Sequence, residues 1–268
     1  MKKIIYDFGS GRGENIPYYL LKSDLVIAIE ANPDNYIYIK NKFKNEIKNN
    51  RLYLINCILA EESGELKKFY IHKTNYLLGQ FPIPNDLLRN NFYSIDLLCR
   101  DVLEIIKLYG EPHYIKIDLE QYDEVVLKRI LSNGIKPLYI SVEGTGQGIL
   151  DVLFSTNGYS AFKLVEGSNV EYLYRNHKIN TSLGIVKYSF PKNSAGPFGN
   201  DVQGNWINKE NFLQFMRFKK FGWRDIHCSR EDLADTVPSF QKLIKTEIKR
   251  EKKAKLIKKF LRIVSKFF

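Results

Sequence analysis

The stretch Ile4–Gly13, which reads IIYDFGSGRG, constrains the fold of this chain more than any other part of the sequence. It opens with three β-forming residues, Asp7 ends the run, and glycines follow at positions 9, 11 and 13. Residues 16–21 then have the character of a helix. Pro17 is compatible with this, since proline is tolerated in the first turn of a helix. Glycines accept positive φ and let a ligand approach the backbone, and a helix start offers unpaired N–H groups. The stretch therefore predicts a strand, a glycine turn and a helix that together receive a ligand.

The residues around this turn discriminate between two cofactor classes. A dinucleotide-binding G-x-G-x-x-G turn that starts at Gly9 would need glycine at position 14, and that residue is Glu14. A carboxylate is a poor neighbour for a pyrophosphate, which binds at a helix N-terminus free of competing negative charge. The next strand-like run, residues 25–29, is followed by Glu30. An acidic residue in that position can accept hydrogen bonds from ribose hydroxyls.

The spacing D-x-G-x-G-x-G, which begins at Asp7, resembles motif I of class I S-adenosylmethionine (SAM) methyltransferases. SAM carries no phosphate, and its ammonium, ribose and sulfonium groups suit the carboxylates of Asp7 and Glu30. The cofactor-binding residues that we predict are Asp7, Gly9, Ser10, Gly11, Glu30, Ala31, Asn56, Cys57 and Asp118.

Strand-like and helix-like segments alternate along the first 164 residues. We expect strands at residues 4–6, 25–29, 52–55, 114–117, 138–142 and 159–164, and helices at 16–21, 34–47, 95–108, 121–131 and 147–156. A locally paired strand at 65–72 and a surface loop at 75–92 interrupt the alternation. Such a pattern predicts an α/β fold, a Rossmann-like doubly wound sheet that is mostly parallel. Because ligands bind outside the carboxyl ends of such strands, one rim should collect Asp7, Glu30, Asn56, Asp118 and Glu143.

Residues 116–131, KIDLEQYDEVVLKRIL, resemble the I-D-x-E-G-x-E-x-x-V-L-K-G segment of the FkbM family of SAM-dependent methyltransferases. Residues 56–71 and 94–98 resemble middle segments of that family, and the resemblance covers roughly residues 4–164. The chain departs from the pattern at Gln121, which replaces the family's glycine, and at Asp123, which replaces its second acid. Residues 194–206 and 223–228 resemble a subset of these enzymes linked to surface-polysaccharide pathways.

The resemblance implies O-methylation of a sugar hydroxyl. The expected acceptor is a sugar nucleotide or glycan precursor in bacterial capsule or lipopolysaccharide biosynthesis. Two alternatives stay open: an N- or carboxyl-methyltransferase of a small metabolite, and a non-catalytic SAM-binding scaffold at a membrane.

Removing the proton of a hydroxyl acceptor calls for a base within about 3 Å. The candidates are Asp118, Glu120, Glu143 and His227, and we predict catalytic roles for Asp118, Glu143 and His227. These three could also hold a divalent ion, which lowers the pKa of the acceptor hydroxyl in some related methyltransferases, although the sequence establishes no metal site.

The stretch 190–204 is rich in Gly, Asn and Pro. It is either a surface loop or a lid that closes over the acceptor, with Trp206 stacking on a sugar ring. We place it within an acceptor-side loop at about residues 166–222 of a methyltransferase domain that spans residues 1–239.

Positive charge gathers in the last 29 residues. Residues 240–268 hold 11 Lys and Arg against two Glu, so of the net charge of +11 only +2 remains on residues 1–239. Because residues 1–239 are nearly neutral, they are not expected to bind nucleic acid. In the tail, apolar residues recur at helical spacing between the lysines, which predicts a basic amphipathic helix that binds anionic membrane. Alternatively, the apolar stripe packs on the body or on a second subunit in a homodimer.

The three cysteines are far apart and include no C-x-x-C pair, which fits a reducing cytosol. Asp7 interrupts the first apolar run after three residues, too early for a signal peptide. We therefore expect a cytoplasmic protein, attached through its tail to the inner face of the cytoplasmic membrane.

Overall fold

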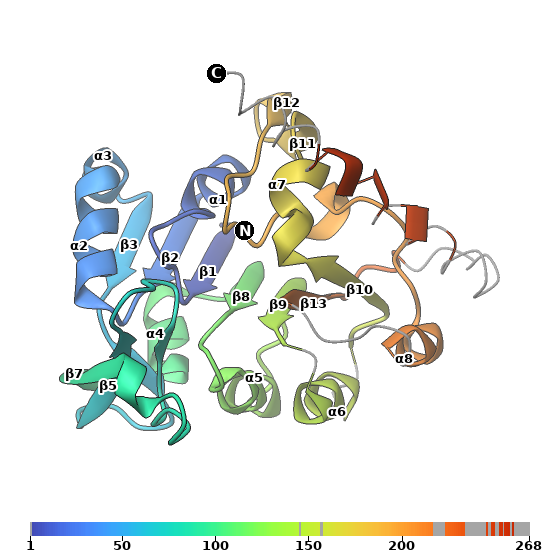
Figure 1. The fold of residues 1–268 in the computed structure, drawn as a ribbon. Coiled ribbons are helices and arrows are strands. Elements are labelled where there is room, and N and C mark those ends of the chain that lie inside the picture. Colours follow the sequence, from blue (N-terminus) through green and yellow to red (C-terminus); the bar gives the residue numbers. More distant parts are fainter. Residues whose placement is uncertain are drawn as a thin grey trace.

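The computed structural model describes residues 2–144, 146–155, 158–216 and 223–233, together with residues 245, 248, 249, 252, 253, 255–257 and 259. Its main sheet (Figure 1) has seven strands, in the order β10 (Ala161–Glu166), β13 (Arg224–Ser229), β9 (Tyr139–Glu143), β8 (Tyr114–Ile117), β1 (Ile4–Phe8), β2 (Leu25–Ile29) and β3 (Leu52–Ile55). Neighbouring strands are parallel except at β13, which runs antiparallel to both β9 and β10. The predicted α/β fold with a mostly parallel central sheet is confirmed.

The order of the strands determines where a ligand can bind. It reverses between β1 and β8, and in doubly wound sheets the crevice outside the carboxyl ends at such a point is the binding site. The antiparallel strand β13 separates β9 from β10, which departs from the order 3-2-1-4-5-6 of dinucleotide-binding domains. All residues of β1, β2 and β8 are buried, as expected for parallel strands covered on both faces.

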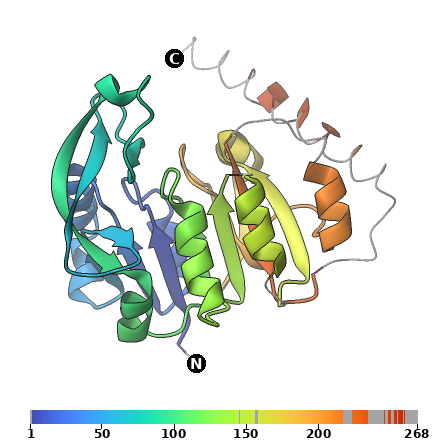
Figure 2. The same cartoon turned by 90° about the horizontal axis from the view of Figure 1, so that it is seen from below.

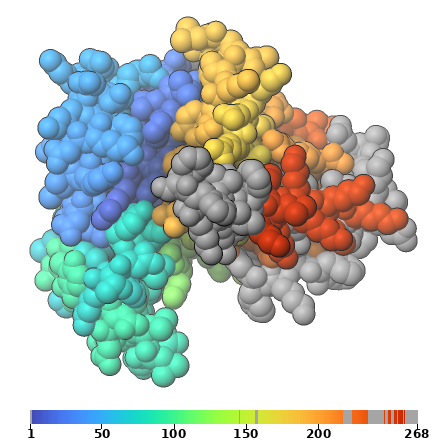
Figure 3. Space-filling view, turned by 45° about the horizontal axis from the view of Figure 1, so that its top comes forward, coloured from blue at the N-terminus to red at the C-terminus, as the bar shows by residue number. Residues whose placement is uncertain are grey.

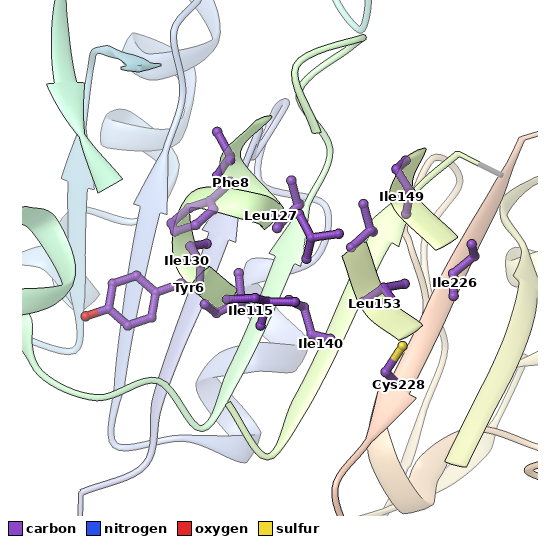
Figure 4. Close-up of a cluster of buried hydrophobic side chains, with 14 of the residues drawn as sticks. Tyr6, Phe8, Ile115, Leu127, Ile130, Ile140, Ile149, Leu153, Ile226 and Cys228 are labelled. Carbon is purple, nitrogen blue, oxygen red and sulfur yellow. The ribbon is translucent and has the colours of Figure 1, made fainter. Parts of the chain in front are cut away.

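Four helices cover one face of the sheet: α4 (Val102–Tyr109), α5 (Asp123–Ser132), α6 (Gln147–Ser155) and α8 (Lys209–Met216). Figure 4 shows part of this core, in which α5 and α6 place leucine and isoleucine side chains over the strands. Leu127 and Ile130 of α5 recur at helical spacing on the buried side of that helix. This apolar stripe is why the helix packs on β8 and β9.

The opposite face is covered by α1 (Ile16–Lys22), α2 (Pro33–Lys42), α7 (Val170–Leu173) and the segment 190–206. The Phe198 ring stacks on the Tyr114 ring of β8 with a centroid separation of 4.0 Å, and Trp206 is 5% exposed. The segment that the sequence suggested as a lid therefore forms part of the core, and Trp206 is too buried to stack on a sugar.

A second, four-stranded sheet has the order β4 (Ile58–Ala60), β7 (Phe92–Asp101), β5 (Leu66–His72) and β6 (Gly79–Gln80). In Figure 2 its teal strands extend past the carboxyl edge of the main sheet. The helix expected at 95–108 is wrong in its first half, because residues up to Asp101 belong to β7 and α4 begins only at Val102. Pairing with β5 up to Leu98 and with β4 from Cys99 to Asp101 holds these residues extended. The Asp101 carboxylate, which accepts from Leu103 N at 3.0 Å, caps the helix that follows.

The remaining described elements are short. The helix expected at 34–47 is broken at Phe43, after which α3 (Lys44–Lys48) begins. A hairpin of β11 (His177–Thr181) and β12 (Gly184–Tyr188), yellow in Figure 3, projects from the surface. Most of the predicted tail helix at 240–268 lies outside the described residues, although those described between 245 and 259 are helical. Among the described residues, no helix combines the length and apolar character needed to cross a membrane.

Replacing Phe198 should test whether the segment 190–206 belongs to the core. We expect Phe198→Ala to lower the free energy of unfolding by about 3–5 kcal/mol, because it removes a buried ring and leaves a cavity. Leu183→Ala, at a position that is 94% exposed in the β11–β12 turn, is the control and should change stability by less than about 0.5 kcal/mol. Urea unfolding measures both, and equal stability of the two variants would show that the segment is peripheral.

Candidate functional site

A cavity of about 300 Å³ lies outside the carboxyl ends of β1, β2, β8 and β9, where the order of the strands reverses. One wall comes from the second sheet and the segment that leads to β6. The predicted site residues that line it are Gly9, Ser10, Gly11, Glu30, Ala31, Cys57, Asp118, Glu120 and Glu143.

The glycine turn after β1 has no room for a side chain at Gly9. Gly9 has φ +79°, and a Cβ there would lie 1.8 Å from the carbonyl oxygen of Asp118. The amides of Gly9 and Ser10 both donate to the carbonyl of Ile29, at 3.0 and 3.1 Å, so the turn is fixed to the end of β2. The sequence thus uses glycine where three chain segments converge at the cavity.

Glu30 is the acidic residue that follows β2, and it is 6% exposed. Its Oε2 accepts from Gly11 N at 2.7 Å, and its Oε1 accepts from Asn32 N at 2.8 Å. Each oxygen keeps further lone pairs for hydroxyl donors. Burial raises the pKa of Glu30 to about 8 despite these two bonds.

Asn56 supports this region from outside the cavity. Its side-chain amide donates to the carbonyls of Glu30 at 2.7 Å and Ala31 at 3.0 Å. It therefore holds the backbone after β2 in place instead of facing the cavity. Its neighbour Cys57 is among the lining residues.

Three carboxyl groups gather at the ends of β8 and β9. Oxygen atoms of Asp118, Glu120 and Glu143 lie within 4.8 Å of one another, which makes them candidate metal ligands. The metal-binding set that the sequence suggested contained His227 in place of Glu120. Lys116 Nζ donates to Asp118 Oδ2 at 2.7 Å and lies 3.5 Å from the carbonyl oxygen of Gly9. A buried ammonium group therefore already neutralises one of the three carboxylates.

The three carboxyl groups differ in their pKa. Burial, together with the Asp118 charge, raises the pKa of Glu143 well above its usual value, so Glu143 keeps its proton in a hydrogen bond to Asp118. Burial alone would raise the pKa of Asp118, but the charge of Lys116 and the bond from Glu143 lower it. Burial, followed by the Asp118 charge, raises the pKa of Glu120 to about 7. Glu120 is thus the group of the three whose protonation changes near neutral pH.

The structure does not bring Asp7 and His227 to the cavity. Asp7 lies in register with Lys116 on β8, its carboxylate oxygens have no hydrogen-bond partner among the described residues, and burial raises its pKa to about 6. His227 is 1% exposed and lies in β13, between Ser141 and Lys163 on the neighbouring strands. Burial, with the charge of Lys163, lowers its pKa to about 3. A neutral imidazole inside the sheet is a structural group in this conformation.

Sequence reasoning missed the part of the cavity wall that residues 75–79 form. The hydroxyl of Tyr76 donates to Glu14 Oε1 at 3.1 Å, and its carbonyl accepts from Asn35 Nδ2 at 2.9 Å. The Arg12 guanidinium lies 4.0 Å from the centroid of the Tyr76 ring. The segment shows no periodicity, and these partners of Tyr76 lie at least 41 residues away in the chain, so the sequence indicates only a loop.

The turn after Asp118 is left-handed at Gln121, the position where the sequence departs from the resembled segment. Glu120 and Gln121 have φ of +49° and +78°, a left-handed conformation that glycine adopts without steric cost. Two consecutive non-glycine residues in this conformation beside a cavity are a local strain of the kind found at functional sites.

We expect Gln121→Gly to raise the free energy of unfolding by about 1 kcal/mol, because it removes a Cβ from a left-handed position while the exposed side chain loses no contact. Gln121→Ala keeps the Cβ and serves as the matched control, with stability near that of the natural chain. Urea unfolding at equal pH compares the two, and a less stable glycine variant would contradict the strain.

Comparison with protein-family models and with curated proteins found no match. Among solved structures, the chain is similar to an FkbM methyltransferase from Methylobacillus flagellatus KT, with a TM-score of 0.42 and 18% identity over 62% of this chain and 40% of that one. It is also similar to an O-methyltransferase from Bacillus cereus in complex with SAH (0.39; 10% over 85% and 74%) and to a precorrin-8w decarboxylase from Methanobacterium thermoautotrophicum (0.39; 9% over 85% and 81%). All three are likenesses at TM-scores below 0.5, so the residues of the cavity carry the functional proposal.

Proposed function

We propose that this chain is a SAM-dependent methyltransferase that acts on a hydroxyl group of a sugar or glycan. The observation that carries the proposal is the pairing of Glu30 with the glycine turn at the reversal of the sheet. The turn places Gly9, Ser10 and Gly11 on the wall of the cavity, and Glu30 offers buried carboxylate oxygens to hydroxyl donors. These features fit the ribose of an adenosyl group.

The surroundings of the glycine turn favour SAM over a dinucleotide. Glu14 lies two residues before α1, lines the cavity, and accepts from Arg12 N at 2.9 Å. Its carboxylate therefore stands near the helix start, where a pyrophosphate would need unopposed N–H donors. A cofactor without phosphate and with a cationic centre is compatible with this negative charge.

The chemistry left to the protein is modest. SAM supplies an electrophilic methyl group when it is bound, so the chain must orient the acceptor and accept its proton. Among the described carboxyl groups of the cavity, Glu120 fits the role of base. With a pKa of about 7 it is partly ionised at neutral pH, and the ionised form can accept a proton from the acceptor hydroxyl. Asp118 is engaged by Lys116, and Glu143 is already protonated, so neither is as well suited as Glu120 to accept the proton.

Calorimetry with S-adenosylhomocysteine (SAH) and with NAD tests the cofactor, and labelled SAM with a panel of sugars, amines and carboxylic acids tests the reaction. We expect SAH to bind, NAD not to bind, and label to appear on a hydroxyl oxygen. Preference for NAD would refute the proposal. Label on nitrogen or on a carboxylate would establish a different acceptor class, and tight SAH binding with no transfer to any acceptor would indicate a scaffold.

The contribution of Glu30 should depend on pH. A ligand whose hydroxyls donate to Glu30 prefers the ionised carboxylate, which predominates above its pKa of about 8. SAH affinity should therefore fall as the pH is lowered from 9 to 6, by on the order of tenfold to a hundredfold. Glu30→Gln should remove this dependence, and Glu30→Ala should weaken binding at pH 9 by about 1–3 kcal/mol. Parallel pH profiles for the natural chain and Glu30→Gln would show that Glu30 does not contact the ligand.

We further propose that residues 240–268 attach the enzyme to anionic membrane. These residues have an excess of basic side chains. Each Lys or Arg near such a surface contributes about 1 kcal/mol of binding free energy. In flotation with anionic vesicles, the full chain should rise with the lipid and a chain that ends at Ser239 should not. Identical behaviour of the two chains would mean that the tail has a structural role.

A further inference from the structure

A second cavity of about 280 Å³ adjoins the first one at the ends of β8 and β9. Three residues line both cavities: Glu120, Glu143 and Trp223. The two spaces therefore meet at two carboxyl groups and an indole ring. Neither the sequence analysis nor the proposed cofactor accounts for this second space.

Trp223 is built into the junction. Its indole ring lies against Gly167, where an added Cβ would come within 2.3 Å of the ring, and Gly167 N donates to the Trp223 carbonyl at 3.1 Å. The absence of a side chain at position 167 thus makes room for the ring. Trp223 is only partly buried, which leaves part of an aromatic surface at the cavity, as binding sites for organic ligands commonly have.

The charges around the second cavity select against anions. Its described lining includes the carboxyl groups of Glu120, Asp123 and Glu143. Among the residues that the structure describes, two cations near the junction are paired: Lys116 with Asp118 at 2.7 Å, and Arg224 with Glu166 at 3.3 Å. A phosphate or carboxylate entering this space would meet the carboxylates of Glu120 and Asp123, while the two described cations are engaged by other acids, and such repulsion is how a site rejects a competing ligand.

We propose that the second cavity holds the methyl acceptor, that the acceptor moiety is an uncharged polyhydroxylated ring placed against Trp223, and that a ring bearing a carboxylate or phosphate is rejected. This proposal rests on the proposed methyltransferase function and specifies its substrate class. In the reaction, the new oxygen–methyl bond forms as the sulfur–methyl bond of SAM breaks. The sulfur keeps the bonding electron pair, and the hydroxyl proton passes to the carboxylate of Glu120.

The test uses the full chain saturated with SAH. Because the chain has two tryptophans and Trp206 is buried, Trp206→Phe leaves Trp223 as the single fluorescent reporter. Titration with methyl glucoside, galactoside, mannoside and rhamnoside should change this fluorescence. The matched methyl glucuronide and glucose 6-phosphate should bind at least about tenfold more weakly at pH 8. Calorimetry on the natural chain repeats the comparison in case Trp206→Phe does not fold.

Two variants connect the binding to the residues named. Trp223→Phe should bind SAH as the natural chain does and lose about tenfold or more in affinity for the glycosides. Glu120→Gln should also bind SAH, and it should reduce the discrimination against glucuronide because one negative charge is gone. In transfer assays with the best glycoside, Glu120→Gln should lower kcat by on the order of a hundredfold or more.

Failure of SAH to bind would refute the methyltransferase function itself. With SAH bound, three outcomes would overturn the acceptor proposal alone: no glycoside binds up to 50 mM, glucuronide or glucose 6-phosphate binds as well as the neutral rings, or a matched amino sugar binds tenfold more tightly than all of them. The last outcome would identify an amine site.

Discussion

A buried ammonium group, that of Lys116, connects the sheet to the glycine turn. A charge inside a protein is costly unless it is paired, and three carboxylates surround this one, from Asp118, Asp7 and Asp225. Although burial alone would lower the pKa of Lys116, these acids raise it, so the lysine stays charged. Since its Nζ reaches both Asp118 and the carbonyl of Gly9, one charge orders the ends of β1 and β8, where the cavity lies.

The same charge separates the roles of the neighbouring acids. Near Lys116, Asp118 is stabilised as a carboxylate, and its negative charge in turn opposes ionisation of Glu143 and Glu120. Asp118 thereby stays ionised, Glu143 stays protonated and donates a hydrogen bond, and Glu120 has a pKa near neutral pH. Pairs of titratable groups whose environments drive their pKa values apart are typical of sites that move protons.

Local sequence was enough to predict the parts of the site that depend on neighbours in the chain. The glycine turn, the strands on both sides of it and the acid after β2 are short-range features, because each is specified by residues within one strand, turn or helix start. Glu30 was predicted from its position after a strand, and in the structure it contacts Gly11 of the turn. The rule that carboxyl ends of parallel strands share a rim also predicts that Asp118 and Glu143 lie together.

What only the tertiary structure decided depends on partners distant in sequence. The sequence predicts a helix for residues 95–101, but pairing with β5 up to Leu98 and with β4 from Cys99 makes them a strand. His227 and Trp206 carry side chains that suit a site, yet β13 inserts between β9 and β10 and buries the first, while the segment 190–206 buries the second. Trp223 reaches the cavity because Gly167 leaves space for its ring. The sequence by itself determined the α/β fold, the glycine turn and the acidic rim; long-range packing determined which aromatic and titratable side chains face the cavity, because burial depends on what covers a residue and not on its type.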